Sequence, residues 1–235
     1  MSPDDVLLCI TNHNHNRNAL FLKSGFSGCF ETIIIDSGSR KAEPGFDVKL
    51  PNVYYSGLFN ESVRQARQRG KRTLFFVAAD VYLRCFRKIH DLIAGLSEEV
   101  SIWAPSSRGQ SLPHCKNKGC GRLRDVPFVE GFAFLVDVAL CDIVYPVDRE
   151  ANRFGYGIDI MLGYNCIKTY RKRCVIDDRV EVHHKEGSGY CQDEALKMMY
   201  EWVAAGGFAP GLKEYFALHR RIPEYCDLLL QFLRG

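Results

Sequence analysis

Residues 73–80 read TLFFVAAD, an apolar run that ends on a carboxylate. A short run without polar alternation predicts a strand buried on both faces, so Asp80 is expected at the carboxyl end of a strand. Two earlier runs have the same form. Residues 6–11 lead into the polar stretch 11–18, TNHNHNRN, and the β-branched residues 32–35 lead into DSGS. The sequence therefore predicts three buried strands, each followed by polar side chains.

Helical segments are expected around these strands. Residues 18–24, 60–69 and 84–96 are predicted to be helical, and residues 53–55 to form a further short strand. Strands that alternate with helices indicate an α/β fold, here a single domain with a mostly parallel central sheet flanked by helices. Ligands bind beyond the carboxyl ends of the strands in such sheets. We therefore expect the functional site where the three polar clusters meet.

The second half of the chain is more mixed. Its predicted elements are a strand at 100–104, an irregular Gly/Pro/Lys-rich loop at 105–127, an apolar segment at 128–136, a Gly-rich aromatic segment at 153–159 that leads into a helix through residue 170, a short strand at 180–182, and helices at 192–205, 212–220 and 224–233. We divide the chain into one domain, residues 1–208, and a C-terminal helical extension, residues 209–235, that packs on it.

Composition and charge exclude several classes of protein. The net charge of the 235-residue chain is +3, from 31 basic and 28 acidic residues, and no long basic block indicates a specific nucleic-acid partner. The amino terminus, MSPDD, lacks the positive charge and long apolar stretch of a secretory signal, and no run approaches the roughly 18 apolar residues of a membrane span. We therefore expect a cytoplasmic protein with reduced cysteines.

The C-terminal helices leave two interpretations open. Their apolar side chains stand beside Arg220, Arg221 and Arg234, a pattern that fits peripheral contact with a membrane or a partner. The same pattern also fits helices that pack on the sheet, and this second interpretation is favoured.

Familiar nucleotide-binding motifs are missing. There is no G-x-G-x-x-G after the first strand and no G-x-x-x-x-G-K-[ST] anywhere, which disfavours Rossmann-type dinucleotide sites and P-loops. Asp80 offers a hard oxygen ligand for Mg²⁺ or Mn²⁺, ions that usually keep phosphate oxygens and waters as their other ligands. Helix capping is an equally good explanation of Asp80 taken alone. Asp36 can accept hydrogen bonds from a ribose or a base, although an Asx-turn is favoured at DSGS.

Two later segments also carry chemistry. Asp159 ends the sequence Gly-Tyr-Gly-Ile-Asp, where glycines let the backbone approach a ligand and aromatic rings can stack on a sugar. This carboxylate suits a general base or, alternatively, an N-cap of the following helix. His183 and His184 are adjacent, so on a strand their side chains point in opposite directions and at most one reaches a given site.

In the order of these segments, residues 5–195 resemble a family-2-type glycosyltransferase of the GT-A fold. The matching pieces are TNHN at 11–14, TIIIDSGS at 32–39, GLFNESVRQA at 57–66, FFVAAD at 75–80, EGF at 130–132, FGYGID at 154–159 and VHHK at 182–185. The resemblance implies a transferase that takes a sugar from a nucleoside-diphosphate sugar, with a UDP-sugar as the default donor, by direct displacement that inverts the anomeric carbon. The acceptor hydroxyl, on a glycan or another molecule, is left open.

The same resemblance implies roles for individual residues. Donor binding falls to Thr11, Asn12, His13, Asp36, Asn60, Ala79 and Asp80. Acceptor binding falls to Glu130, Gly131 and Tyr156. Mn²⁺ or Mg²⁺ would be held by Asp80 with His183 or His184, and Asp159 would act as the catalytic base. These assignments require Asp36, Asp80 and Asp159 to meet at the rim of one pocket.

Two positions depart from the family pattern. Ala78 stands where the first acid of the D-x-D motif is expected, and Ile160 follows Asp159 where a second acid is expected. Two alternatives therefore stay open. One is a nucleotidyltransferase of similar fold, although such enzymes usually carry a Gly-rich basic loop after the first strand and this loop is rich in Asn and His. The other is a catalytically silent domain that binds nucleotide sugars, which Ala78 favours.

Overall fold

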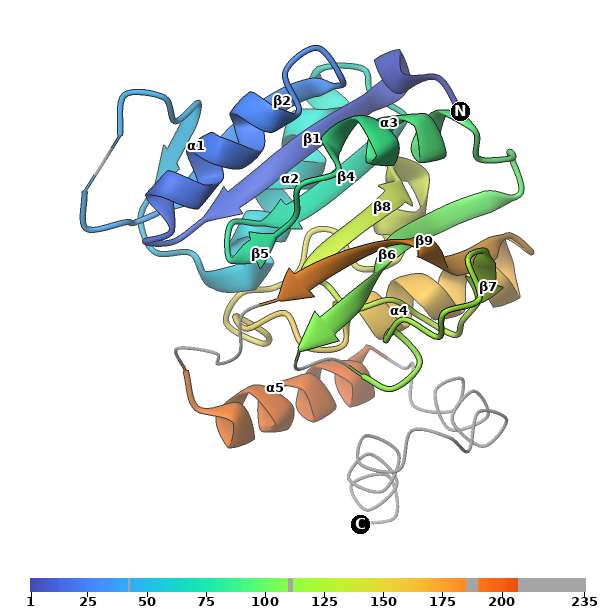
Figure 1. Ribbon diagram of the computed structural model, residues 1–235. Coiled ribbons are helices and arrows are strands. Elements are labelled where there is room, and N and C mark those ends of the chain that lie inside the picture. The colour runs from blue at the N-terminus through green and yellow to red at the C-terminus, as the bar shows by residue number, and fades with distance from the viewer. Residues whose placement is uncertain (42, 110–111, 185–189, 207–235) are drawn as a thin grey trace.

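A central β-sheet with helices against both faces organises the chain (Figure 1). The computed structural model describes residues 1–41, 43–109, 112–184 and 190–206. The strands are β1 (Val6–Asn12), β2 (Glu31–Ser37), β3 (Val48–Leu50), β4 (Thr73–Ala78), β5 (Val81–Tyr82), β6 (Val100–Gly109), β7 (Leu123–Asp125), β8 (Ala133–Asp137) and β9 (Arg173–His184). The helices are α1 (Asn16–Gly25), α2 (Tyr54–Gln68), α3 (Phe86–Ala94), α4 (Ile158–Tyr164) and α5 (Gln192–Ala205), with 3-10 turns at Pro3–Asp5 and Val138–Ile143 and a π-helical turn at Asn165–Thr169.

The first half of the sheet is parallel, as predicted. The strand order is β3-β2-β1-β4-β8-β6-β9-β5, with β7 paired to β9. Strand β1 lies between β2 and β4, and all three run in the same direction. Thr11 pairs with Ala78 and Asn12 with Asp36, so the three polar clusters that follow these strands do share one edge of the sheet.

The second half corrects the prediction of a mostly parallel sheet, because the whole sheet is mixed. Strand β8 runs antiparallel between β4 and β6, and β5 and β7 run antiparallel to β9. Ala133 at the start of β8 pairs with Val77 at the end of β4. An antiparallel strand begins where its neighbour ends, so the residues that precede β8 lie at the same edge as Asp80.

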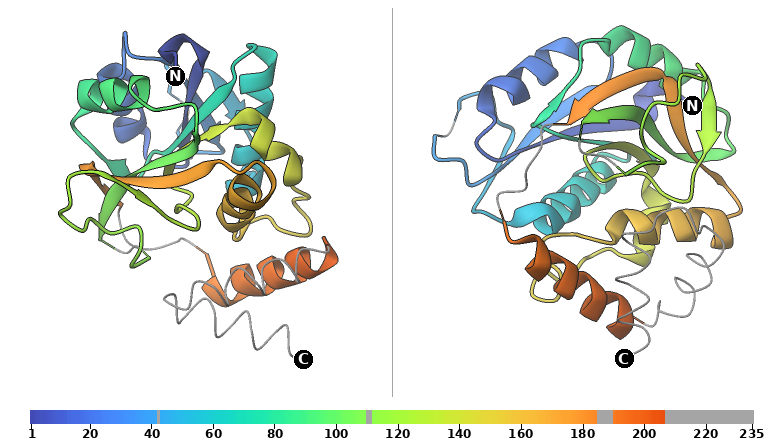
Figure 2. Two further views of the ribbon diagram at one scale, coloured as in Figure 1. Left: turned by 90° about the vertical axis from the view of Figure 1, so that its right-hand side faces the viewer. Right: turned by 60° about the horizontal axis from the view of Figure 1, so that its bottom comes forward.

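Both faces of the sheet are buried. Helices α1 and α3 cover one face, and α2, α4 and α5 lie on the other side (Figure 2). Alternate residues of β1 enter different cores: Leu8 and Ile10 pack with α1 and α3, whereas Leu7 and Cys9 pack with α2 and α4. This double burial explains why the strand sequences are continuously apolar.

Two local predictions were wrong. Residues 53–55 do not form a strand, since Val53 precedes α2 and Tyr54 and Tyr55 lie in its first turn. A three-residue apolar run has no period that separates helix from strand, and packing decided the outcome. The stretch 105–127 is not wholly irregular, because β6 continues to Gly109 alongside the long strand β9 and β7 pairs with β9 as well.

The described residues include no helix that is both long and apolar enough to cross a bilayer. The predicted helices at 212–220 and 224–233, and with them the proposed extension 209–235, lie outside the described residues.

Candidate functional site

The carboxyl edge of β4 brings together Asp80 and His184. After β4 the chain turns into β5, where Val81 pairs with His184 of β9. The Nε2 atom of His184 lies 3.3 Å from Oδ2 of Asp80. On its other side the His184 ring stacks on Phe132, with 4.4 Å between ring centroids and an interplanar angle of 13°. Strand pairing and ring stacking thus fix the imidazole beside the carboxylate.

Asp80 is held as an ionised carboxylate. Burial by itself raises its pKa, but the hydrogen bond and charge of His184, together with the charge of His15, bring the pKa below its ordinary value. Its second oxygen, Oδ1, is buried without a hydrogen-bond partner among the described residues. A buried anionic oxygen without a partner is unusual and is satisfied well by a cation.

Only one histidine of the pair faces this carboxylate. His183 is exposed and its ring lies near that of Tyr82, with 6.3 Å between centroids. This arrangement follows from the alternation of side chains along β9. His183 therefore lies away from the metal position that the resemblance implied, and His184 is the histidine placed to serve there.

The Asp80 carboxylate and the His184 imidazole could supply two of the ligands of a divalent metal ion. Carboxylate oxygens suit Mg²⁺ and Mn²⁺, and an imidazole nitrogen is the better ligand for a first-row transition metal, so the Asp80–His184 pair favours Mn²⁺. Within the described ranges, His, Cys, Asp and Glu side chains do not gather in threes around a possible metal position. A metal held here would therefore take most of its ligands from phosphate and water.

Asp159 is the second residue of α4, a helix that begins directly after Gly157. Gly157 has φ +88°, a conformation that favours glycine and lets the chain turn into the helix. Burial raises the pKa of Asp159 to about 7, the charge of Glu130 adds to this rise, and the backbone N–H groups of Ile160 and Gly131 oppose it. The carboxyl group therefore changes protonation state near neutral pH, which is the property a general base requires.

Tyr55 supports the Asp159 region and was not found from the sequence. Its hydroxyl group donates to the carbonyl oxygen of Gly131 at 2.7 Å. The N–H of the same glycine donates to Asp159. A Cβ added at Gly131 would lie 2.3 Å from the Tyr55 oxygen, and one at Gly155 would lie 2.2 Å from a ring carbon of Tyr55. The ring thus packs against two glycine backbones that lie beside Asp159.

Tyr156, one of the predicted acceptor residues, belongs to a cluster of aromatic rings. The Phe154 and Tyr190 rings stack at 4.6 Å between centroids, and Tyr156 meets Tyr190 edge-on at 6.1 Å. The guanidinium of Arg153 lies 4.8 Å from the centre of the Phe154 ring and pairs with Glu194 of α5. Phe154 is buried under these contacts, so Tyr156 and Tyr190, which are partly exposed, are the rings of this group that can present an apolar face to a sugar.

Glu130 and Gly131 lie on the segment that leads into β8. One carboxylate oxygen of Glu130 accepts a hydrogen bond from the backbone N–H of Leu112 at 3.1 Å. Glu130 raises the pKa of Asp159, and Gly131 donates to it, so these two acceptor candidates are electrostatically coupled to the base candidate.

On the donor side, Asn12 organises the loops after β1 and β2. Its amide donates to Asp36 at 2.7 Å and to the Ser39 hydroxyl at 3.0 Å, while its carbonyl oxygen accepts from the His15 N–H at 3.0 Å. Asp36 also accepts the backbone N–H of Ser39, three residues on, so its side chain fixes the DSGS turn, although an Asx-turn as predicted would use the N–H two residues on. Both Asn12 and Asp36 are buried, so the structure uses them to fix the loop at the edge of the sheet.

Other predicted donor residues make contacts within the protein. Asn60 exchanges two hydrogen bonds of 2.8 Å with the backbone of Val147, and these bonds attach α2 to a neighbouring loop. The Ala79 N–H donates to the Thr11 carbonyl oxygen, and its own carbonyl oxygen accepts from Asn18. These contacts explain why the positions are polar or small without any ligand.

Two further donor candidates stand at the end of β1. The Thr11 hydroxyl group lies 3.5 Å from the carbonyl oxygen of Val77 on the neighbouring strand β4. His13 is exposed, and its Nδ1 lies 2.6 Å from the carbonyl oxygen of Ser37. Beside them, a hollow of about 510 Å³ is lined by Asn14, Asn16, Arg40 and Lys41, whose two cations suit an anionic ligand.

A series of contacts connects the two carboxylates that the proposed chemistry needs. Asp80 contacts His184, His184 stacks on Phe132, and Phe132 follows Gly131, which donates to Asp159. The Ala78 N–H also donates to the Phe132 carbonyl oxygen at 2.7 Å. Asp80 and Asp159 therefore belong to one edge of the sheet, while Asp36 lies on the same edge across β1.

Comparison with known proteins identifies the fold. No protein-family model matches the sequence, and no curated protein sequence matches it either. Among solved structures, the mannosyltransferase PcManGT from Pyrobaculum calidifontis, in complex with GDP-Man and Mn²⁺, superposes with a TM-score of 0.60 over 99% of this chain and 76% of its own, at 12% sequence identity. The chain has the GT-A glycosyltransferase fold.

Two other glycosyltransferase structures agree with this GT-A assignment. GalNAc-T7 with UDP, GalNAc and Mn²⁺ has a TM-score of 0.59 and 14% identity; the match covers 97% of this chain and 54% of GalNAc-T7. Residues 1–349 of S. aureus TarS with UDP-GlcNAc have a TM-score of 0.58 and 13% identity, over 90% of this chain and 72% of that one. At such low identity the likeness establishes the GT-A fold and leaves the activity to be argued from the site.

The pKa of Asp159 predicts a pH-dependent stability. A carboxyl group whose pKa is raised on folding contributes stability that is fully present below its unfolded pKa, near 4, and is lost as pH rises through about 7. Asp159→Asn cannot ionise, so its melting temperature should exceed that of the wild type by roughly 8–16 °C at about pH 8 and differ little near pH 4. Melting curves across this range test the prediction. A difference that does not change with pH would contradict the assigned pKa.

Proposed function

We propose that this protein is a glycosyltransferase that moves a sugar from a nucleoside-diphosphate sugar to an acceptor hydroxyl group, with inversion at the anomeric carbon. The observation that carries the proposal is that the Asp80–His184 carboxylate–imidazole pair and Asp159, a carboxyl group with a pKa near neutrality, are connected at one edge of the sheet through Phe132 and Gly131. The GT-A neighbours with bound nucleotide sugars support it. A UDP-sugar remains the default donor and the cytoplasm the expected location.

Asp80 and His184 would hold Mn²⁺ or Mg²⁺ against the donor diphosphate. A bound divalent cation neutralises the charge that develops on a leaving diphosphate, an effect worth several kcal/mol. The protein's own contribution is an ionised carboxylate with a free oxygen and an imidazole fixed by stacking. Ala78 supplies no second carboxylate, so we expect metal affinity to depend strongly on the nucleotide.

Asp159 would remove the proton from the attacking acceptor hydroxyl. Its raised pKa gives it more affinity for a proton than an exposed carboxylate has, and at neutral pH a large share of it is still ionised. Tyr156 and Tyr190 would lie beneath the acceptor sugar, with Phe154 supporting Tyr190 from below, and Glu130 would help to orient the sugar. Asn12 and Asp36 would shape the nucleoside side of the site.

The two rival functions give different results in one screen. Nucleotide sugars and nucleoside triphosphates are offered with Mn²⁺, and sugar release, sugar transfer and pyrophosphate release are measured. Pyrophosphate from a triphosphate would favour a nucleotidyltransferase. Binding of a nucleotide sugar without hydrolysis or transfer to any acceptor would favour a silent binding domain.

Sugar transfer should require Asp159. Asp159→Asn should lower kcat by about 10²- to 10⁴-fold, the usual contribution of a positioned base. In the wild type, kcat should rise with pH through about 7 as Asp159 loses its proton. Asp125→Asn, which removes an exposed carboxylate paired with Arg173, serves as the control and should keep wild-type turnover. Unchanged turnover in Asp159→Asn would exclude it as the base.

The adjacent histidines provide a matched test of the metal position. His184→Ala should weaken Mn²⁺-dependent binding of UDP or GDP by about tenfold or more, since it removes one of two protein ligands. His183→Ala, next to it on the opposite side of β9, should bind as the wild type does. Isothermal titration with and without Mn²⁺ measures both. Equal effects of the two substitutions would show that His184 has no special role.

Tyr55 should position the base through Gly131. Tyr55→Phe keeps the ring and removes the hydrogen bond to the Gly131 carbonyl, so the Gly131 N–H should hold Asp159 less well. We expect kcat/KM to fall about tenfold, the equivalent of one hydrogen bond, and the midpoint of the pH profile to move upward. Tyr54→Phe is the control. A fall in kcat/KM with an unmoved midpoint would mean that Tyr55 acts on stability or packing alone.

A further inference from the structure

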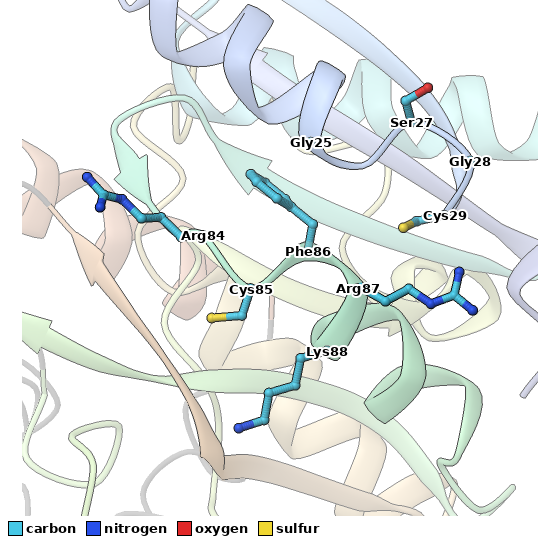
Figure 3. Close-up of a pocket in the computed structure, with 9 residues that line it drawn as sticks. All are labelled: Gly25, Ser27, Gly28, Cys29, Arg84, Cys85, Phe86, Arg87 and Lys88. Carbon is cyan, nitrogen blue, oxygen red and sulfur yellow. The ribbon is translucent and has the colours of Figure 1, made fainter.

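A surface hollow lies on the sheet face covered by α1 and α3, outside the site described above. It has a volume of about 460 Å³ and is lined by Gly25, Ser27, Gly28, Cys29, Arg84, Cys85, Phe86, Arg87 and Lys88 (Figure 3). The Phe86 ring fills the approach to α1 so closely that a Cβ on Gly25 would lie 2.2 Å from it. The floor of the hollow is therefore apolar, and cationic side chains surround it.

The cations around the hollow do not converge. Figure 3 shows the charged ends of Arg84, Arg87 and Lys88 pointing in three different directions. Arg84 and Lys88 are exposed, and neither forms an ion pair with the part of the chain that the structure describes, whereas Arg87 pairs with Asp91 at 3.2 Å. A small anion needs donors that converge on it. Spread cations instead match an extended anionic surface.

Exposed apolar side chains border these cations. Phe21 on α1 is 48% exposed, and its ring contacts that of Phe86 edge-on, with 5.5 Å between centroids. Leu20 is 36% exposed on the same helix. Arg17 lies one helical turn before Phe21, is exposed and makes no ion pair with the described residues. The two helices thus present apolar side chains that are flanked by cations.

We propose that this α1–α3 face, formed by Arg17, Leu20, Phe21, Arg84, Arg87 and Lys88, docks on a membrane surface that contains anionic lipids. Each basic side chain near such a surface contributes about 1 kcal/mol, and Phe21 and Leu20 add burial at the boundary between headgroups and acyl chains. A nucleic acid would also attract the cations, but it offers no apolar layer for Leu20. The occupant that matches both parts of the face is the lipid surface.

The α1–α3 face begins beside the proposed site and extends away from it. Helix α1 begins at Asn16, directly after the polar loop of β1, and Arg84 follows β5, which carries the chain away from Asp80. Docking here would fix how the carboxyl edge of the sheet is oriented relative to the bilayer. The inference does not depend on sugar transfer, because it rests on the exposed surface of α1 and α3 alone.

Vesicle sedimentation of the full chain tests the proposal. Phosphatidylcholine vesicles are compared with vesicles that also contain phosphatidylserine. The wild type should partition onto the anionic vesicles and be released by salt, which screens the charges. Arg84→Glu with Lys88→Glu should weaken partitioning by about tenfold or more, and Phe21→Ser by about fivefold. The matched control, Lys116→Glu with Arg122→Glu, reverses two exposed charges on the segment before β7 and should change it little.

Thermal melting confirms that each variant is folded, as expected for exposed positions. The proposal is overturned if the wild type ignores phosphatidylserine, if the control pair weakens partitioning as much as the Arg84/Lys88 pair does, or if Phe21→Ser has no effect. Binding of a DNA or RNA oligonucleotide through these residues, without vesicle binding, would assign the face to nucleic acid and equally reject the membrane.

Discussion

The pairing of β8 with β4 is the constraint on which the candidate site depends. Because β8 runs antiparallel to β4, its first residues lie beside the last residues of β4, and the Phe132 carbonyl oxygen accepts the Ala78 N–H at 2.7 Å. This pairing places Phe132 where it can stack on His184 and places Gly131 where it can donate to Asp159. Without this pairing, Asp80 and Asp159 would not be connected through Phe132 and Gly131 in the folded protein.

The two carboxylates differ in protonation because their surroundings differ. Asp80 has His184 beside it and His15 near it, and positive charge keeps its pKa low in spite of burial. Asp159 has the carboxylate of Glu130 near it and only backbone N–H groups to oppose burial, so its pKa rises to about 7. One edge of the sheet thus carries a carboxylate with a lowered pKa, suited to a cation, and a carboxyl group that exchanges protons near neutral pH.

Much of the first half of the molecule could be predicted from local sequence. The buried strands around Ile10, Ile34 and Phe76, the helices between them and the polar strand ends all follow from apolar runs and their boundaries. The prediction failed at Val53–Tyr55 and in the mixed half of the sheet. Tyr55 was missed for the same reason, since its importance comes from contact with Gly131 and Gly155, which lie far along the chain.

The sequence by itself determined which segments are buried strands and which polar residues lie at their ends. Both follow from local features: the run of apolar residues and the residue types that end a strand or helix. It also placed Asp159 after a glycine that can adopt a positive φ. Only the tertiary structure decided that β8 enters antiparallel, that His184 rather than His183 meets Asp80, and that the Tyr55 hydroxyl donates to the Gly131 carbonyl oxygen. These outcomes depend on which distant segments pair, and strand partners are selected by packing over the whole sheet.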